Sequence, residues 1–150
     1  MTLLNWGLFG LFCGTFLTAT IIPFPSDVLV IGAYELDYSI QNILIVATIG
    51  NFLGTLTNYW IGFKSSKAVK GSEKLKKRFK LTDKKMLKWE KRLAKWGVFL
   101  GFLAWIPIIG EPMVAILGFF RVKLFPLTIT IIIGVFLRYF LLLYFYLGGF

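Results

Sequence analysis

The sequence contains no histidine and only one cysteine, and each absence excludes a class of chemistry. Without histidine the chain has no imidazole metal ligand, no Ser-His-Asp or Cys-His catalytic arrangement and no histidine nucleophile. A lone Cys13 in an apolar run cannot form an intrachain disulfide or a thiolate zinc cluster. The sequence also lacks the GxxxxGK[ST] and GxGxxG phosphate-binding motifs. We therefore expect a protein that is not an enzyme and that binds no metal or cofactor.

Charge is scarce as well, and it is unevenly placed. Charged residues make up 16% of the 150 residues, against about 25% in soluble domains. Residues 64–95 hold 14 of the 17 lysines and arginines and three acids, so the net charge of +10 arises there. The remaining 118 residues carry three bases and four acids. This pattern excludes a soluble enzyme and indicates an integral membrane protein with one basic insert. No nucleic-acid-binding module surrounds the insert, so we expect no nucleic-acid partner.

Four apolar blocks make up the rest of the chain. They cover residues 3–32, 40–63, 97–120 and 124–150. The second and the fourth block are long enough to span a bilayer as single helices. The first and the third are interrupted by helix-breaking residues, because proline lacks an N–H group and disfavours helix in the residue before it. We predict breaks at Pro23, Pro25, Pro107, Gly110 and Pro112.

The chain also repeats itself at an offset of 84 residues. An acid follows a proline by four residues twice, as Pro23 with Asp27 and as Pro107 with Glu111. Chance similarity between two apolar segments is the alternative, but shared proline, acid and glycine positions are harder to obtain by chance. Only residues 97–106 precede the second motif without charge, and as a helix they would be about 15 Å long, half a bilayer. The motif is therefore predicted at the tip of a re-entrant hairpin.

These observations predict an all-α integral membrane protein built as an inverted repeat of two units. The first unit is 1–63, with a re-entrant hairpin at 3–36 and a transmembrane helix at 40–63. A basic segment at 64–96 joins it to the second unit, 97–150, with a hairpin at 97–120 and a transmembrane helix at 124–148. The positive-inside rule places the basic segment in the cytoplasm. Loop 34–39 and both termini then lie outside the cell (plasma or inner) membrane, while residues 121–123 lie inside. Four full spans would instead place residues 121–123 outside.

The basic segment is predicted to contain an interfacial helix. Thr82 or Asp83 can cap a helix that runs to Trp96. Its spacing places Met86, Trp89, Leu93 and Trp96 on one face, flanked by lysines. One interpretation is binding to anionic lipid headgroups, and the other is control of topology alone. The candidate headgroup contacts are Lys88, Lys91, Lys95, Arg121 and Lys123.

Asp27 and Glu111 are the main candidates for a binding site. A charged residue at the bilayer centre costs roughly 2.5–3.5 kcal/mol on insertion scales, so two at equivalent positions of a repeat indicate function. The alternative is that each acid only caps the helix that follows it, as the pair Ser26-Asp27 suggests. Arg138 either pairs with one of these acids, binds a substrate phosphate, or extends to the membrane interface. Asn51 either lines a cavity at this site or cross-links helices.

The motifs resemble those of the DedA family, also called SNARE-associated or VTT-domain membrane proteins, and especially its YqaA-like branch. The matching motifs are Gly14-Thr15-Phe16-Leu17, Pro23-Phe24-Pro25-Ser26-Asp27, Ala47-Thr48-Ile49-Gly50-Asn51 with Gly54, Tyr59 and Gly62, Lys95-Trp96-Gly97, Ile106-Pro107 with Gly110-Glu111-Pro112 and Gly118, and Gly134 with Arg138-Tyr139. The resemblance covers nearly the whole chain. It implies two opposed re-entrant hairpins and the movement of phospholipids or polyprenyl-phosphate carriers between leaflets.

The resemblance also shows one departure from the family pattern. DedA proteins usually carry arginines three residues before and after the proline of the second hairpin, where this chain has Ala104 and Gly110. Arg138 or Arg121 would have to substitute for them. We predict a lipid transporter or scramblase whose partners are membrane lipids with anionic headgroups. A small proton- or cation-coupled exchanger and a non-transporting membrane organiser are the alternatives, and the sequence leaves open whether the chain forms a homo-oligomer.

Overall fold

The computed structural model describes residues 2–20, 24–106 and 109–149, and helices dominate them. The helices are α1 (Thr2–Thr20), α2 (Asp27–Glu35), α3 (Ile40–Lys70), α4 (Glu73–Arg78), α5 (Asp83–Phe102), the short 3-10 helix η1 (Leu103–Trp105), α6 (Gly110–Phe119) and α7 (Leu124–Tyr146). No strand occurs within those three ranges. The all-α prediction is therefore confirmed. By length and composition, α3 and α7 could each cross a membrane, as the sequence predicted.

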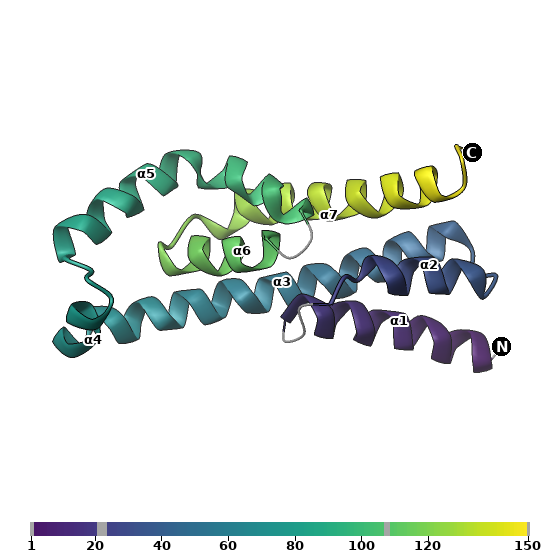
Figure 1. Cartoon of the computed structure of the whole chain (residues 1–150), viewed down its shortest axis with the longest axis horizontal. Helices are drawn as coiled ribbons and strands as arrows, with labels where there is room; N and C mark the ends of the chain where they lie inside the picture. The colour runs from purple at the N-terminus through teal and green to yellow at the C-terminus, as the bar shows by residue number, and fades with distance from the viewer. Residues whose placement is uncertain (1, 21–23, 107–108, 150) are drawn as a thin grey trace.

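The helix bounds follow the offset of the predicted repeat. The long helix α3 begins at Ile40 and α7 begins 84 residues later, at Leu124. The short helices α2 and α6 begin 83 residues apart, at Asp27 and Gly110. Figure 1 shows that α1 ends, and α2 begins, beside the middle of α3. Two structural halves of the same helix order are therefore present, while their inverted placement in a membrane stays a prediction.

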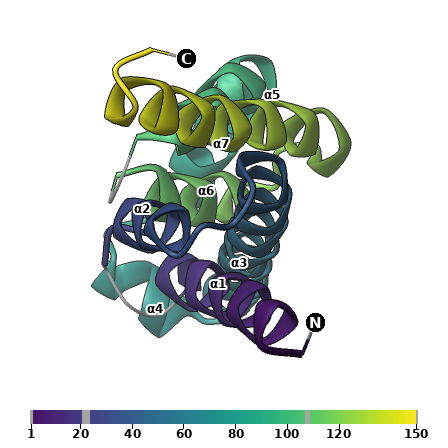
Figure 2. The same ribbon diagram turned by 90° about the vertical axis from the view of Figure 1, so that its right-hand side faces the viewer.

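The two ends of the molecule differ in what they carry. Both chain termini and the turn between α2 and α3 lie at one end, and α4 lies at the other (Figure 1). The turn between α6 and α7 lies toward the α4 end, and Tyr59 Oη in the second half of α3 donates a 2.7 Å hydrogen bond to its Val122 carbonyl. Seen along its length in Figure 2, the molecule has α2 and α3 between α1 and α7.

The helix boundaries near the basic segment differ from the predicted ones. The predicted span ended at residue 63, but α3 continues to Lys70, since residues 64–70 contain no glycine or proline and Gly71 is the C-cap. The predicted interfacial helix and the first arm of the second hairpin form one continuous helix, α5. Lys70 Nζ lies 2.5 Å from Glu90 Oε1, so an ion pair joins the extension of α3 to α5. Consequently, both predicted boundaries of the basic segment fall inside helices.

The predicted apolar face of α5 is divided in the structure. Met86 and Leu93 are buried, whereas Trp89 and Trp96 are about half exposed. Gly97 and Gly101 continue the buried side toward α7, since a Cβ on Gly101 would lie 2.3 Å from a methyl carbon of Leu127. The tryptophans therefore point away from the protein, which is the orientation required of membrane anchors.

Glycines let the helices pack with their backbones in contact. A Cβ on Gly62 of α3 would lie 1.9 Å from the Ala115 carbonyl oxygen of α6, and one on Gly118 would lie 2.1 Å from that of Tyr59. Gly50 and Gly54 make a similar approach to α1. Small residues permit this geometry, and they are typical of interfaces between membrane helices. Helix α3 therefore contacts α6 as closely as it contacts α1.

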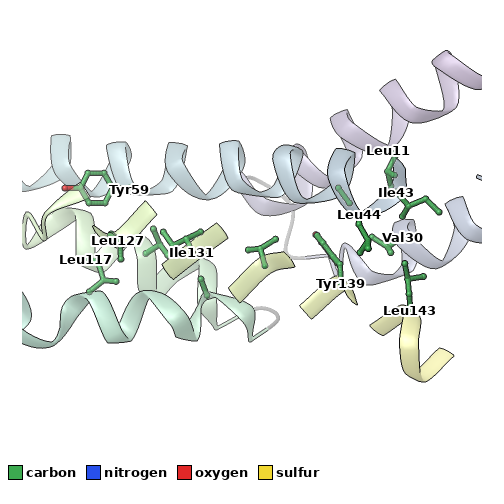
Figure 3. Packing of buried hydrophobic residues seen from close by; sticks show 14 of the residues in the cluster. Leu11, Val30, Ile43, Leu44, Tyr59, Leu117, Leu127, Ile131, Tyr139 and Leu143 are labelled. Carbon is green, nitrogen blue, oxygen red and sulfur yellow. The ribbon is translucent and has the colours of Figure 1, made fainter. Parts of the chain in front are cut away.

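One apolar core joins the two halves. Figure 3 shows buried side chains along α3, with Tyr59, Leu117, Leu127 and Ile131 toward one end and Val30, Ile43, Leu44, Tyr139 and Leu143 toward the other. Both groups draw residues from α3 and α7. Because each half contributes to each group, neither half encloses a core of its own.

Candidate functional site

A buried ion pair connects the beginning of α2 to the middle of α7. Arg138 Nε lies 2.9 Å from Asp27 Oδ1, and Arg138 Nη2 lies 2.7 Å from the same oxygen. The side chain of Arg138 is 8% exposed and that of Asp27 is 22% exposed. Of the three positions that the sequence left open for Arg138, the structure shows pairing with Asp27. Nη1 donates no hydrogen bond within the described ranges, so part of the guanidinium stays available.

Two hydroxyl groups extend this pair into a network. Arg138 Nη2 also donates a 3.3 Å hydrogen bond to Ser26 Oγ, which lies 2.8 Å from the Tyr139 hydroxyl. Ser26 precedes α2, yet its side chain makes no capping hydrogen bond to that helix. Both side chains at the start of α2 are thus directed to α7, so helix capping does not account for them. The sequence placed Ser26 and Tyr139 in the family motifs beside Asp27 and Arg138, but it gave no sign that the two hydroxyl groups meet.

Glu111 approaches this network from the second half. It lies in the first turn of α6, where a carboxylate also suits the positive end of the helix dipole. The charge of Arg138 acts on the Glu111 carboxylate, and both acids act on the Tyr139 hydroxyl. Arg138 pairs directly with Asp27 and not with Glu111. Asp27, Glu111 and Arg138 therefore carry a net charge of −1 when all three are ionised.

The predicted proline breaks are only partly covered by the described residues. Pro107 lies outside the described residues, as does Pro23 of the first hairpin. Pro25 lies in the non-helical segment before α2, as predicted. Pro112 does not break a helix; it lies in the first turn of α6, where its missing N–H group costs no hydrogen bond.

The structure has no room at Gly110 for the arginine that the family pattern would place there. A Cβ there would lie 2.6 Å from the Ala104 carbonyl oxygen and 2.7 Å from the Ala104 Cα. Ala104 and Gly110, the two positions at which the family pattern has arginine, are therefore in backbone contact with each other. Of the two possible substitutes, Arg121 is exposed near the α4 end, and only Arg138 reaches the acids.

The polar residues of α3 have two different roles. Asn58 Nδ2 donates a 2.7 Å hydrogen bond to the Ala19 carbonyl and so cross-links α3 to the end of α1. Asn51 is 2% exposed, and its Nδ2 has no partner in the described part of the chain, nor does Thr48 Oγ1. Thr55 donates to the Asn51 carbonyl groups from one turn away. Asn51 therefore has a buried Nδ2 donor without a partner among the described residues, whereas Nδ2 of Asn58 is used in the cross-link to α1.

The predicted headgroup contacts are all exposed. They are Lys88, Lys91 and Lys95 on α5 and Arg121 and Lys123 in the turn before α7. Arg121 Cζ lies 5.2 Å from the centre of the Phe63 ring, and Lys95 Nζ lies 5.9 Å from that of Trp96. Within the described residues, no three His, Cys, Asp or Glu side chains come together to hold a metal ion.

Comparison with known proteins gives the family. The VTT domain model matches residues 7–147. The "Inner membrane protein YqaA" of Escherichia coli (strain K12) is 29% identical over 137 residues, which are 88% of this chain and 85% of that protein. The protein of that name from Shigella flexneri gives the same values, and an "Uncharacterized protein" of Haemophilus influenzae is 29% identical over 143 residues, 89% of this chain and 83% of its own length. No solved structure matches. The chain therefore belongs to the VTT-domain family, as a homologue of YqaA within the DedA group of membrane proteins that its motifs resemble.

Proposed function

We propose that this protein moves phosphate-bearing lipids, either phospholipids or polyprenyl phosphates, between membrane leaflets as a transporter or scramblase. The observation that carries the proposal is the buried pair of Asp27 and Arg138, which joins the two halves where α2 begins. Charged groups are expensive in a bilayer, and those retained there usually mark a substrate or ion pathway. Arg138 is the one base outside residues 64–123, so it is the cation available to a headgroup at that depth.

The geometry supports an exchange of partners at Arg138. A lipid phosphate has several acceptor oxygens and suits the planar guanidinium, whose Nη1 is unused in the described structure. In the resting state Asp27 neutralises Arg138. When a headgroup enters, the phosphate takes the place of Asp27, and Glu111 and Asn51 line the remaining surface. The phosphate is then paired with Arg138 while it crosses, and the negative charge of the displaced Asp27 is uncompensated until a proton or a cation binds.

The membrane arrangement is part of the same proposal. The protein lies in the cell membrane with both hairpins re-entrant, segment 64–96 in the cytoplasm and the two halves inverted relative to each other. Its partners are lipids with anionic headgroups. The name of the E. coli relative, an inner membrane protein, supports the location, and the exposed lysines of α5 support the orientation.

Leaflet exchange in liposomes tests this function. The purified protein is reconstituted with labelled phospholipid or polyprenyl phosphate, and exchange is followed for the native chain, Asp27→Asn and Glu111→Gln. Asp37→Asn is the matched control, because Asp37 lies in the exposed turn after α2 at a φ of 61°, which asparagine also adopts. We expect exchange by the native protein and the control, and about a tenfold or greater loss in Asp27→Asn, because Arg138 then lacks its counter-charge. Exchange that neither Asp27→Asn nor Glu111→Gln changes would refute the site.

One observation favours a second candidate, a proton-coupled exchanger. Arg138 is paired with Asp27, so the negative charge of Glu111 is uncompensated until a proton or a cation binds. Liposomes with an imposed pH gradient separate the two functions. Ion flux without lipid exchange would favour the exchanger, whereas lipid exchange that responds to the gradient would favour coupled lipid transport.

A further inference from the structure

Two cations converge on one aromatic ring near the α4 end of the molecule. Lys67 Nζ lies 5.1 Å from the centre of the Phe63 ring, and Arg121 Cζ lies 5.2 Å from it. Phe63 and Lys67 lie one turn apart on α3, whereas Arg121 comes from the turn between α6 and α7. Both basic side chains are exposed. The arrangement brings two positive charges from distant parts of the sequence to one ring.

No acid of the chain compensates these two charges. The seven acids are Asp27, paired with Arg138; Glu35, bonded to Tyr146; Asp37, in the turn after α2; Glu73 and Asp83, both paired with Lys76; Glu90, paired with Lys70; and Glu111, at the start of α6. Neither Lys67 nor Arg121 forms an ion pair with them. Two positive charges beside one ring, without an acidic partner, favour the binding of an anion there.

The backbone fixes the position of Arg121. Its φ of 56° is left-handed, and its N–H group donates a 3.0 Å hydrogen bond to the Gly118 carbonyl. The next residue, Val122, is tied to α3 through the 2.7 Å hydrogen bond from Tyr59 Oη to its carbonyl. Tyr59 lies one turn before Phe63 on the same helix. The turn that carries Arg121 is therefore attached to the helix that carries Phe63 and Lys67.

An exposed apolar stripe on α3 leads to the same place. Ile45, Ile49, Leu53 and Trp60 are between 37% and 55% exposed and follow one another at helical spacings of four, four and seven residues. The next steps of four and three residues reach Lys64 and Lys67, which are also exposed. An acyl chain lying along this stripe would bring its headgroup to the cations.

We propose that Lys67, Arg121 and Phe63 form a binding site for the headgroup of an anionic phospholipid from the leaflet next to the basic segment, with one acyl chain along the stripe of α3. The phosphate binds to the ammonium group of Lys67 and the guanidinium group of Arg121 beside the aromatic ring. This site is separate from Asp27 and Arg138 and does not depend on the movement of lipid between leaflets.

Lipid binding to the full-length protein tests the proposal. The protein is purified in a neutral detergent, and binding of phosphatidylglycerol and phosphatidylcholine is measured by native mass spectrometry. The test variant is Lys67→Gln with Arg121→Gln, and the matched control is Lys74→Gln with Lys77→Gln, two exposed lysines of α4. Phe63→Leu tests the ring without a change of charge. Glu111→Gln alters the other site only.

We expect the native protein, the α4 control and Glu111→Gln to prefer phosphatidylglycerol. The test variant should bind it about tenfold more weakly, since each cation near the membrane surface contributes to attraction of anionic lipid. Phe63→Leu should give a smaller loss. Equal affinities of the test variant and the control would overturn the site. Displacement of phosphatidylglycerol by millimolar inorganic phosphate alone would show a general anion site and overturn the assignment to a lipid.

Discussion

At the scale of single residues, the pair of Asp27 and Arg138 accounts for two charges that a membrane would otherwise exclude. Each side chain is largely buried, and each is the other's ion-pair partner in the described structure. A buried pair contributes little net stability, but removal of one partner leaves an uncompensated charge and typically costs 3–5 kcal/mol. Comparison of the loss of stability with the loss of transport, when either partner is removed, therefore distinguishes a structural role of the pair from a role in transport.

The first prediction is a double-mutant cycle at this pair. Asp27→Asn and Arg138→Gln should each lower the melting temperature of the detergent-solubilised protein, while the double variant should lose less than the sum of the two, because neither side chain is then charged. The readouts are thermal unfolding and leaflet exchange for all four proteins. If the pair binds the substrate, the double variant recovers stability but not exchange. Recovery of both would show that the pair is only structural.

The sequence predicted that Asp27 and Glu111 belong to the site, but not which of them pairs with Arg138. Two proline-acid motifs at one offset identified Asp27 and Glu111, because charge is rare in the apolar blocks. Which of the two acids pairs with Arg138 depends on how α7 packs against α2. Asp27 and Arg138 are 111 positions apart in the chain. The hydrogen bond between Ser26 and Tyr139 depends on the same packing. Periodicity along the chain carries no information about such contacts.

At the scale of helices, sequence rules gave the starts better than the ends. In the structure α3 begins at Ile40 and α7 at Leu124, where the second and fourth apolar blocks follow polar turns. The end of α3 was placed too early, at 63, because hydropathy falls there although helix propensity does not. Membrane thickness limits an apolar run, but it does not end a helix. Only Gly71, at the end of the polar extension, does so.

The second prediction concerns the crossing of α3 and α6. Gly118→Ala places a methyl group 2.1 Å from the Tyr59 carbonyl oxygen, so the helices must separate, at a cost of about 1–3 kcal/mol. Gly32→Ala is the control, since a Cβ at that exposed position of α2 meets nothing within 4 Å. Thermal unfolding in detergent should show a clear loss for Gly118→Ala and none for Gly32→Ala. Equal effects would mean that helix propensity, not close packing, decides both.

At the scale of the whole molecule, charge is divided between the two ends. The end with the chain termini carries Glu35 and Asp37, and the end with α4 carries most of the lysines together with Arg121 and Lys123. Because the turn before α7 is bonded to α3 near the basic segment, residues 121–123 and the basic segment should face the same side of the membrane. Four full spans would place them on opposite sides.

The third prediction is the accessibility of single cysteines in intact cells. Cys13→Ala removes the native thiol, and Leu36→Cys, Lys77→Cys and Lys123→Cys each add one at an exposed position. Leu36 is chosen in preference to Tyr38 of the same loop, because the hydroxyl group of Tyr38 packs beside Gly7. A membrane-impermeant maleimide should label position 36 in intact cells, and positions 77 and 123 only after permeabilisation, because positively charged loops are retained in the cytoplasm. Labelling of position 123 from outside, with position 77 protected, would exclude the paired re-entrant hairpins and require four full spans.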